Sequence, residues 1–207
     1  MTRTALALAA MTVAAASDAH AQAKNYQIWR VDSGIAGAYA LGTGAAGGGG
    51  VAEIKFNVLD QVSAGVRFDG VITFGGNFGL DGGENVSVGL GVQSASLLKG
   101  EYFFTNGGAR PFVGLGAGMY AITSQNVDTN PDGATILQQA GRYFGLAPQI
   151  GVDLGRLRLG ATFNWIVAAD VEVTQMVGGN EEITRTSQNY VTFEMLIRFG
   201  GRKKVRR

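Results

Sequence analysis

The side chains that most often perform covalent catalysis are almost missing from this 207-residue chain. It has no Cys and a single His, His20, which lies in an N-terminal segment that we expect to be removed. A Ser-His-Asp or Ser-His-Glu triad would need that His as its base. The lack of Cys excludes disulfides, thiolate metal sites and Cys nucleophiles. Since no converging pair of carboxylates stands out either, we expect no catalytic residue, no cofactor and no enzyme activity.

One segment has the residue types of a calcium-binding loop. Asp128, Asn130, Asp132 and Gly133 follow the start of the D-x-N-x-D-G pattern. The twelfth position holds Gln139, whereas calcium loops place there a Glu that binds the ion through two oxygens. Because Pro-Asp-Gly is a turn signal in its own right, we interpret the segment as a loop turn. A weak calcium site is the alternative.

Charged side chains alternate with apolar ones along much of the chain. Between positions 51 and 58, apolar residues occupy one face, whereas Glu53, Lys55 and Asn57 occupy the other. A period of two is typical of a β-strand with one apolar face. The same alternation places six basic and five acidic side chains on polar strand faces: Glu53, Lys55, Arg67, Asp69, Lys99, Glu101, Arg110, Asp153, Arg158, Glu194 and Arg198.

The elements that must position these charges are eight expected strands. They cover residues 28–41, 50–58, 62–75, 88–104, 110–122, 142–154, 157–167 and 188–199. The first strand is assigned from one apolar face with Ile28, Ala36, Ala38 and Ala40. In the fourth strand the alternation slips at residues 94–97, which indicates a bulge or a strand longer than a membrane crossing.

The links between the expected strands alternate in length. Those after the second, fourth and sixth strands are short, whereas the others cover residues 42–49, 76–87, 123–141 and 168–187. Short links at one rim and long links at the other are typical of outer-membrane barrels, with the long loops outside the cell. An even number of strands places both chain ends on the periplasmic side.

The two ends of the chain differ in composition from its middle. Residues 1–23 contain Arg3, an uncharged run from Thr4 to Ser17, and small residues that allow cleavage after Ala21 or Ala23. This order is that of a secretory signal peptide, and the run is too short to span a membrane. The barrel domain would then cover residues 24–200.

A basic tail, residues 201–207, closes the chain and contains five Lys or Arg. It raises the net charge of the processed chain from −4 (11 − 15) to +1 (16 − 15). Such a run often binds nucleic acid, but an exported chain rarely meets DNA. We expect a solvated periplasmic tail, with lipid or peptidoglycan contact as the alternative and no nucleic-acid partner.

Four segments carry a resemblance to a known family: Lys99–Phe104, Arg110–Gly118, Pro148–Gly155 and Leu157–Gly160. They resemble paired strands of the small outer-membrane β-barrel proteins, the group of the OmpA transmembrane domain, OmpX and OmpW-like proteins. The resemblance covers about residues 28–200. It implies an all-β fold, an eight-stranded antiparallel up-and-down barrel in the outer membrane of a Gram-negative cell. It also implies contact with outer-membrane lipid, lipopolysaccharide and the barrel-insertion machinery.

The end of the last strand departs from the family pattern. Family members often end on an aromatic residue that the insertion machinery reads. In this chain Phe199 could serve, but Gly200 to Arg207 follow it.

The two faces of the strands must be assigned to the inside and the outside of the barrel. A soluble, lipocalin-like barrel has its apolar face inside, whereas a barrel in lipid has the reverse polarity. The polar faces also carry six glycines that would leave room for long side chains in a narrow lumen: Gly65, Gly114, Gly116, Gly118, Gly151 and Gly160. We therefore predict that the charges point inward and pair into a network that fills the bore, because unpaired buried charge is costly.

Aromatic residues near the strand ends predict two girdles at the membrane interfaces. Tyr102, Phe104, Phe112 and Phe199 lie near the rim with short turns, and Phe74, Tyr143 and Trp165 lie near the rim with long loops.

The expected function follows from these features. We expect a non-enzymatic integral outer-membrane protein with a structural or surface-interaction role, whose extracellular loops meet an unknown partner. A narrow porin-like transporter of small or hydrophobic molecules is the first alternative, and a soluble lipocalin-like binder is the second.

Overall fold

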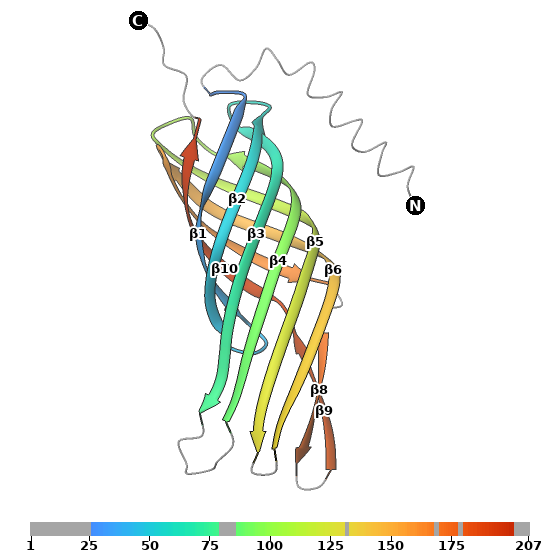
Figure 1. The fold of residues 1–207 in the computed structure, drawn as a ribbon. Coiled ribbons are helices and arrows are strands. Elements are labelled where there is room, and N and C mark those ends of the chain that lie inside the picture. Colours follow the sequence, from blue (N-terminus) through green and yellow to red (C-terminus); the bar gives the residue numbers. More distant parts are fainter. Residues whose placement is uncertain (1–25, 79–85, 131–132, 168–169, 178–179, 201–207) are drawn as a thin grey trace, which may run out of the picture.

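The computed structural model describes residues 26–78, 86–130, 133–167, 170–177 and 180–200 (Figure 1). The expected signal peptide with Ala21 and Ala23, and the basic tail at 201–207, lie outside these residues. Within the described ranges, no helix is long and apolar enough to cross a membrane.

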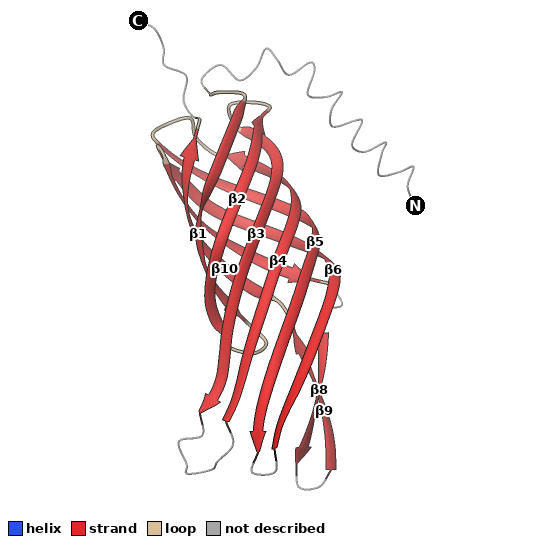
Figure 2. Cartoon of the chain, in the orientation of Figure 1, coloured by secondary structure: helices blue, strands red, loops and turns tan. Residues whose placement is uncertain are grey.

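Ten strands form among the described residues, and Figure 2 shows how they make up nearly all of the fold. They are β1 (Trp29–Ala40), β2 (Ala46–Asn57), β3 (Val62–Phe78), β4 (Val86–Phe103), β5 (Ala109–Asn130), β6 (Gly133–Leu154), β7 (Leu157–Ile166), β8 (Asp170–Val177), β9 (Asn180–Ser187) and β10 (Tyr190–Phe199).

Eight of these strands close into one barrel. The strand order is β1-β10-β7-β6-β5-β4-β3-β2, and every neighbouring pair is antiparallel. The ladder between β1 and β10 closes the barrel, with Val31 opposite Phe199 and Ala40 opposite Tyr190. The remaining strands, β8 and β9, form a separate hairpin. The prediction of an eight-stranded antiparallel up-and-down barrel is therefore confirmed.

The two ends of the barrel differ in their connections. The links from β2 to β3, from β4 to β5 and from β6 to β7 are short and lie at the end that carries both chain termini (Figure 1). At the opposite end β3, β4, β5 and β6 run well past the other barrel strands (Figure 1). The three links predicted to be short are short, but two of the links predicted to be long are not: β1 and β2 are joined by residues 41–45, and β5 and β6 by residues 131–132.

Two of the expected loops turn out to contain regular structure. The loop predicted for residues 123–141 is mostly strand, because the β5–β6 ladder continues as far as the pair Asn130 and Gly133. The calcium-like segment therefore spans the end of β5 and the start of β6, and residues 131–132 between them lie outside the described residues. Within residues 168–187, β8 and β9 pair as a hairpin.

The glycine run in β2 explains why the predicted loop at 42–49 was too long. Gly47 and Gly49 face the barrel interior, where a Cβ atom would collide with the main chain of β3 at the carbonyls of Ile72 and Gly70. Because only a residue without a side chain allows this close approach, the glycines are part of the strand and not of a flexible link.

Two details of the predicted strand faces are wrong. In β1, Ala36, Ala38 and Ala40 point into the barrel, whereas Trp29 and Ile35 point outward. In β4 the pairing with β3 and β5 is continuous from Val86 to Phe103, so the strand has no bulge. With 18 residues it is instead longer than a membrane crossing, which was the other alternative. The slip in the pattern arises because Ser94 and Ser96 face outward, while Ala95 and Leu97 face inward.

Candidate functional site

The barrel wall has the polarity of a protein in lipid. Large hydrophobic side chains are exposed on the outside, among them Ile35, Leu98, Ile150 and Phe193, each more than 60% exposed. The interior holds thirteen buried charged side chains among the described residues. This is the reverse of a water-soluble barrel, so the arrangement contradicts the lipocalin-like alternative.

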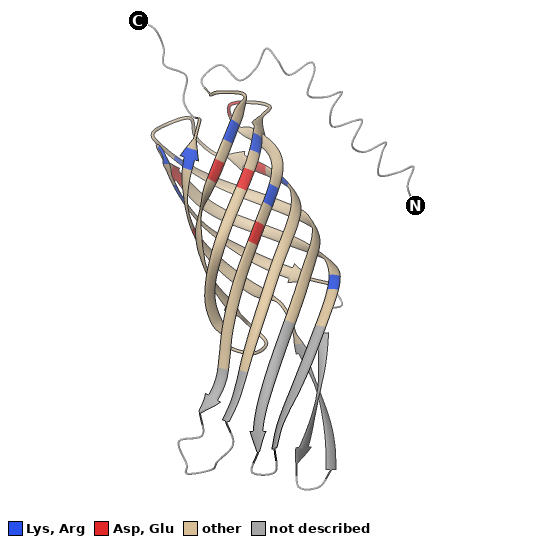
Figure 3. Cartoon of the chain, in the orientation of Figure 1, with Lys and Arg blue, Asp and Glu red and all other residues tan. Residues whose placement is uncertain are grey.

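Charged residues of the described strands gather toward the end of the barrel that has the short turns (Figure 3), and most of them are buried. All eleven charges of the predicted polar faces point inward, and none is more than 7% exposed. Ten of the eleven join one continuous set of ion pairs: Glu53, Lys55, Arg67, Asp69, Lys99, Glu101, Asp153, Arg158, Glu194 and Arg198. We call this set, with the two additions below, the lumen network.

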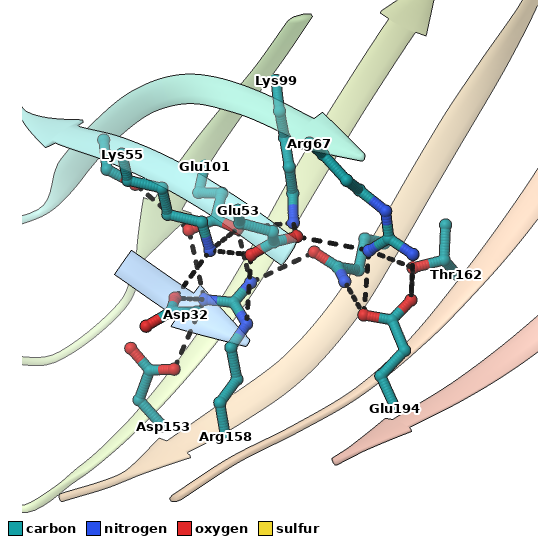
Figure 4. A network of polar contacts seen from close by, with 12 residues as sticks. Asp32, Glu53, Lys55, Arg67, Lys99, Glu101, Asp153, Arg158, Thr162 and Glu194 are labelled. Atoms are coloured by element: carbon teal, nitrogen blue, oxygen red, sulfur yellow. Dashed lines mark hydrogen bonds and ion pairs between the residues drawn. The ribbon is translucent and has the colours of Figure 1, made fainter. Parts of the chain in front are cut away.

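Glu53 and Glu101 are the two acidic centres of the lumen network (Figure 4). Glu101 accepts from Lys55 Nζ at 2.8 Å and from the guanidinium of Arg158, and it forms an ion pair with Lys99 Nζ at 2.8 Å. Glu53 pairs with the same two lysines and accepts from Arg67 at 3.2 Å. Because each carboxylate meets several cations, neither charge is left without a partner in the dry interior.

Arg67 organises the part of the lumen network farthest from the chain termini. Its guanidinium makes two parallel bonds to Glu194 and donates through Nε to Asp69 at 2.9 Å. Gln149 and Thr192 also donate to the Glu194 carboxylate, at 2.8 and 3.0 Å. A carboxylate that accepts this many bonds is held in one orientation.

Two members of the lumen network were missed by the sequence analysis, Arg30 and Asp32 on β1. Arg30 pairs with Asp32 at 2.7 Å and with Asp153 at 3.2 Å, and Arg198 pairs with Asp153 as well. The signal was present in the sequence, because the two charges alternate with Trp29 and Val31. With them the network has six basic and six acidic side chains, so it carries no net charge.

Arg110 is the predicted lumen charge that lies apart from this network. It donates to the main-chain carbonyls of Asp60 and Thr105. Its guanidinium carbon lies 3.8 Å from the ring centre of Tyr26 and 4.0 Å from that of Phe103. Carbonyl dipoles and ring faces thus surround the cation, and Arg110 closes the end of the barrel that has the short turns.

The other half of the interior is mainly apolar, with Thr73 and Gln93 as buried polar side chains, a division that the sequence analysis did not foresee. Its cluster contains small and branched side chains and two tyrosines, from every barrel strand except β2 and from the β1–β2 link: Ala38, Ala40, Ala45, Val71, Ala95, Leu97, Tyr120, Ile122, Ala147, Ile166 and Tyr190. At the boundary with the lumen network, the Tyr120 hydroxyl donates to Asn164 Oδ1 at 3.0 Å. The lumen therefore consists of a charged layer and an apolar layer in series.

Two glycines of the polar faces leave room for the charged side chains. A Cβ atom at Gly114 would lie 3.3 Å from the Glu101 side chain and 3.5 Å from that of Lys99. At Gly160 it would lie 3.4 Å from Gln149 Nε2. Larger residues would crowd the network at these points.

The predicted aromatic girdles divide into two groups. Tyr102, Phe104, Phe199, Phe74 and Trp165 point outward and are 44–62% exposed. Phe112 and Tyr143 were wrongly assigned to the girdles because they occupy inward-facing positions. Phe112 is 2% exposed and lies under the Arg158 guanidinium, and Tyr143 packs against the apolar cluster.

The chemistry that these residues can perform is limited by their pairing. The carboxylates of the lumen network accept hydrogen bonds from cations at distances near 3 Å, and the cations are held by more than one partner. No group of three His, Cys, Asp or Glu that could hold a metal ion occurs among the described residues.

Comparison with known proteins identifies the fold. No protein-family model matches the chain, and no curated protein matches it in sequence. Among solved structures, the outer-membrane protein OprG of Pseudomonas aeruginosa is similar, with 13% identity, 86% of this chain and 97% of that chain covered, and a TM-score of 0.50. Neisserial surface protein A matches with 12% identity, 84% and 97% coverage, and a TM-score of 0.47. The N-terminal β-barrel domain of OprF from Pseudomonas aeruginosa matches with 12% identity, 84% and 99% coverage, and a TM-score of 0.43.

The likeness to OprG and the polarity of the wall agree with each other. The fold is that of the eight-stranded outer-membrane barrels, as the resemblance of the four strand segments implies.

Proposed function

We propose that this chain is a non-enzymatic outer-membrane protein whose closed barrel holds extracellular β-hairpins in place for contact with other surfaces. Lipid and lipopolysaccharide would surround the apolar wall, and the barrel-insertion machinery would deliver the chain to the membrane. The partner of the hairpins is an unknown molecule outside the cell.

The length of the central strands carries this proposal. A tilted strand crosses a bilayer with about 9–11 residues, and β7 and β10 have 10 each. In contrast, β5 and β6 have 22 residues each and stay paired along their whole length. Roughly half of this hairpin must project beyond the membrane, since its other end is level with the short turns.

The filled interior favours the interpretation of the barrel as a scaffold over that of a wide channel. The lumen network fills the part of the bore near the chain termini, and the apolar cluster fills the part beyond it. Ions crossing this path would have to separate buried ion pairs and then lose their water in an apolar layer, and both steps are costly.

The first test is electrical. The mature chain is refolded in detergent, inserted into a planar bilayer and recorded in potassium chloride. We expect no discrete channels. Reproducible small channels would contradict the closed scaffold and favour the narrow transporter.

The second test concerns the hairpins. Gram-negative cells display either the full chain or a variant in which residues 124–139 are replaced by Asn-Gly, and their attachment to protein-coated glass is counted. We expect several-fold lower attachment for the variant, with equal amounts of folded barrel shown by the gel mobility of unboiled samples. Equal attachment would contradict a surface role for the β5–β6 hairpin.

A transporter of small hydrophobic molecules is the second candidate, and one observation favours it. The interior half beyond the lumen network is lined by apolar side chains such as Val71, Leu97 and Ile166. Uptake of an apolar dye into vesicles containing the protein would distinguish this candidate from the scaffold, which takes up none.

A further inference from the structure

The buried charges of the described barrel interior do not balance. Seven of its thirteen buried charged side chains are basic and six are acidic. The lumen network contains six of each, so the excess cation is Arg110, which is 3% exposed. Asp153 is the acidic residue whose charge acts on Arg110 most, and its carboxylate is already paired with Arg30 and Arg198. Since a buried cation without an anionic partner is costly, the excess charge needs a partner from elsewhere.

The contacts of the Arg110 guanidinium leave one of its nitrogen atoms without an acceptor. The rings of Tyr26 and Phe103 pack against the group, with their centres 3.8 and 4.0 Å from its central carbon. The carbonyl oxygens of Thr105 and Asp60 accept from Nε and Nη2. Nη1 is buried and has no hydrogen-bond acceptor among the described residues, although it carries two of the five N–H donors of the group. The Nη1 edge is therefore available to an acceptor from outside the chain.

Two further arginines raise the positive potential at this end of the barrel. Arg30 lies over the same Phe103 ring, with its guanidinium carbon 5.4 Å from the ring centre. The charges of Arg30 and Arg198 both act on Arg110. Like charges repel more strongly in a dry interior than in water. An anion at the Nη1 edge would pair with Arg110 and would also weaken this repulsion.

We propose that Arg110 Nη1 binds one small monovalent anion, such as chloride, at the end of the barrel that has the short turns. A single negative charge brings the interior to neutrality, whereas a phosphate or sulfate dianion brings more charge than the interior lacks. Hydrogen bonds between a guanidinium and an anion are among the strong ones. The site does not depend on the role proposed for the extracellular hairpins, so either proposal can fail without the other.

The first experiment locates the anion in the parent protein. Bromide is the probe, because it has the charge of chloride and its anomalous scattering identifies it in a crystal. The mature chain is refolded in detergent, crystallised and soaked in sodium bromide. We expect an anomalous peak in hydrogen-bond contact with Arg110 Nη1. This measurement needs no variant, so it decides the proposal even if a change at Arg110 prevents folding.

The second experiment measures binding in solution. The parent, Arg110→Gln and Arg142→Gln are unfolded in urea while chloride replaces gluconate, a larger anion, at constant ionic strength. A ligand that binds only the folded chain stabilises it by mass action. Above saturation, each tenfold rise in chloride should therefore lower the ratio of unfolded to folded parent about tenfold. Arg142→Gln removes an exposed cation from β6 and should behave as the parent does, whereas Arg110→Gln should show no dependence on chloride.

Three outcomes would overturn the proposal. A water molecule at Nη1 in the bromide-soaked crystals would show that the guanidinium is hydrated and not paired with an anion. Stability of the parent that does not change with chloride would show that no anion is taken up on folding. A chloride dependence that Arg110→Gln retains in full would assign the binding to other cations of the chain.

Discussion

Arg67 and Glu194 form a two-pronged ion pair across the interior of the barrel. Nη1 of Arg67 donates to one carboxylate oxygen of Glu194 at 2.8 Å, and Nη2 donates to the other at 2.7 Å. The two residues lie on β3 and β10, which are not neighbours in the sheet. The pair therefore ties together parts of the wall that share no main-chain hydrogen bonds.

Removal of this arginine should destabilise the barrel strongly. In Arg67→Ala, the carboxylates of Glu194, Glu53 and Asp69 lose a shared cation inside a dry interior. Breaking a buried pair in this way costs about 3–5 kcal/mol. Arg142→Ala, on the exposed face of β6, should change stability by less than about 0.5 kcal/mol. The measurement is the temperature at which the folded band disappears from unboiled gels.

Arg198→Ala extends the same comparison. Arg198 pairs with Asp153 and lies 3.6 Å from Asp32. Arg198→Ala should therefore lower the thermal stability of the barrel more than Arg142→Ala does. If all three variants lose the same thermal stability, the lumen network does not hold the barrel together.

The glycine run of β2 allows a test at two adjacent positions. Gly49→Ala should destabilise the barrel, because its Cβ atom would strike the main chain at Gly70. Gly50→Ala should be neutral or slightly stabilising, because it points outward and its Cβ atom would come no closer than 3.8 Å to the Gly34 carbonyl oxygen. Heat-dependent gel mobility of the two variants measures the difference. If the two variants unfold at the same temperature, β2 and β3 can move apart at this point without loss of stability.

The order of the two interior layers predicts which change opens the bore. Arg158→Ala removes a central cation of the lumen network but leaves the apolar cluster closed, so bilayer recordings should stay silent. Adding Leu97→Ala and Ile122→Ala should produce discrete conductance, since both side chains belong to that cluster. Conductance in Arg158→Ala alone would place the barrier in the network instead.

Shortening the β5–β6 hairpin should leave the barrel as stable as before. With residues 124–139 replaced by Asn-Gly, Thr123 and Ala140 still pair, and a two-residue turn suits antiparallel strands. The ladder of β6 with β7 begins only at Gly145 and is untouched. Unfolding in urea, followed by the fluorescence of Trp29 and Trp165, measures the effect. A large loss of stability would show that the projecting hairpin supports the wall.

The sequence determined the strands and most of their inward-facing charges. Regular alternation, as in residues 51–58 and 157–165, depends only on local geometry, because successive side chains of a strand point to opposite faces. For the same reason, Glu53, Lys55 and Arg158 could be assigned to the polar face without knowledge of their partners.

Only the tertiary structure decided which face lies inside where both faces are apolar. In β1, Ile35 and Ala36 are equally compatible with a lipid-facing position. Closure of the barrel turned the alanines inward, because a narrow interior admits small side chains and the lipid accepts large ones. Phe112 and Tyr143 were misassigned for a similar reason, since an aromatic residue near a strand end suits a girdle or an interior cluster.

The ion pairs across the lumen could not be predicted from the sequence. Which cation meets Glu101 depends on the register of strands far apart in the chain, and so does the separation of the charged layer from the apolar layer. The length of the β5–β6 ladder also depends on pairing between strands and could not be predicted from the local pattern. Polar residues such as Gln125 and Asn126 do not alternate with apolar ones, yet main-chain pairing with the partner strand carries the ladder through them.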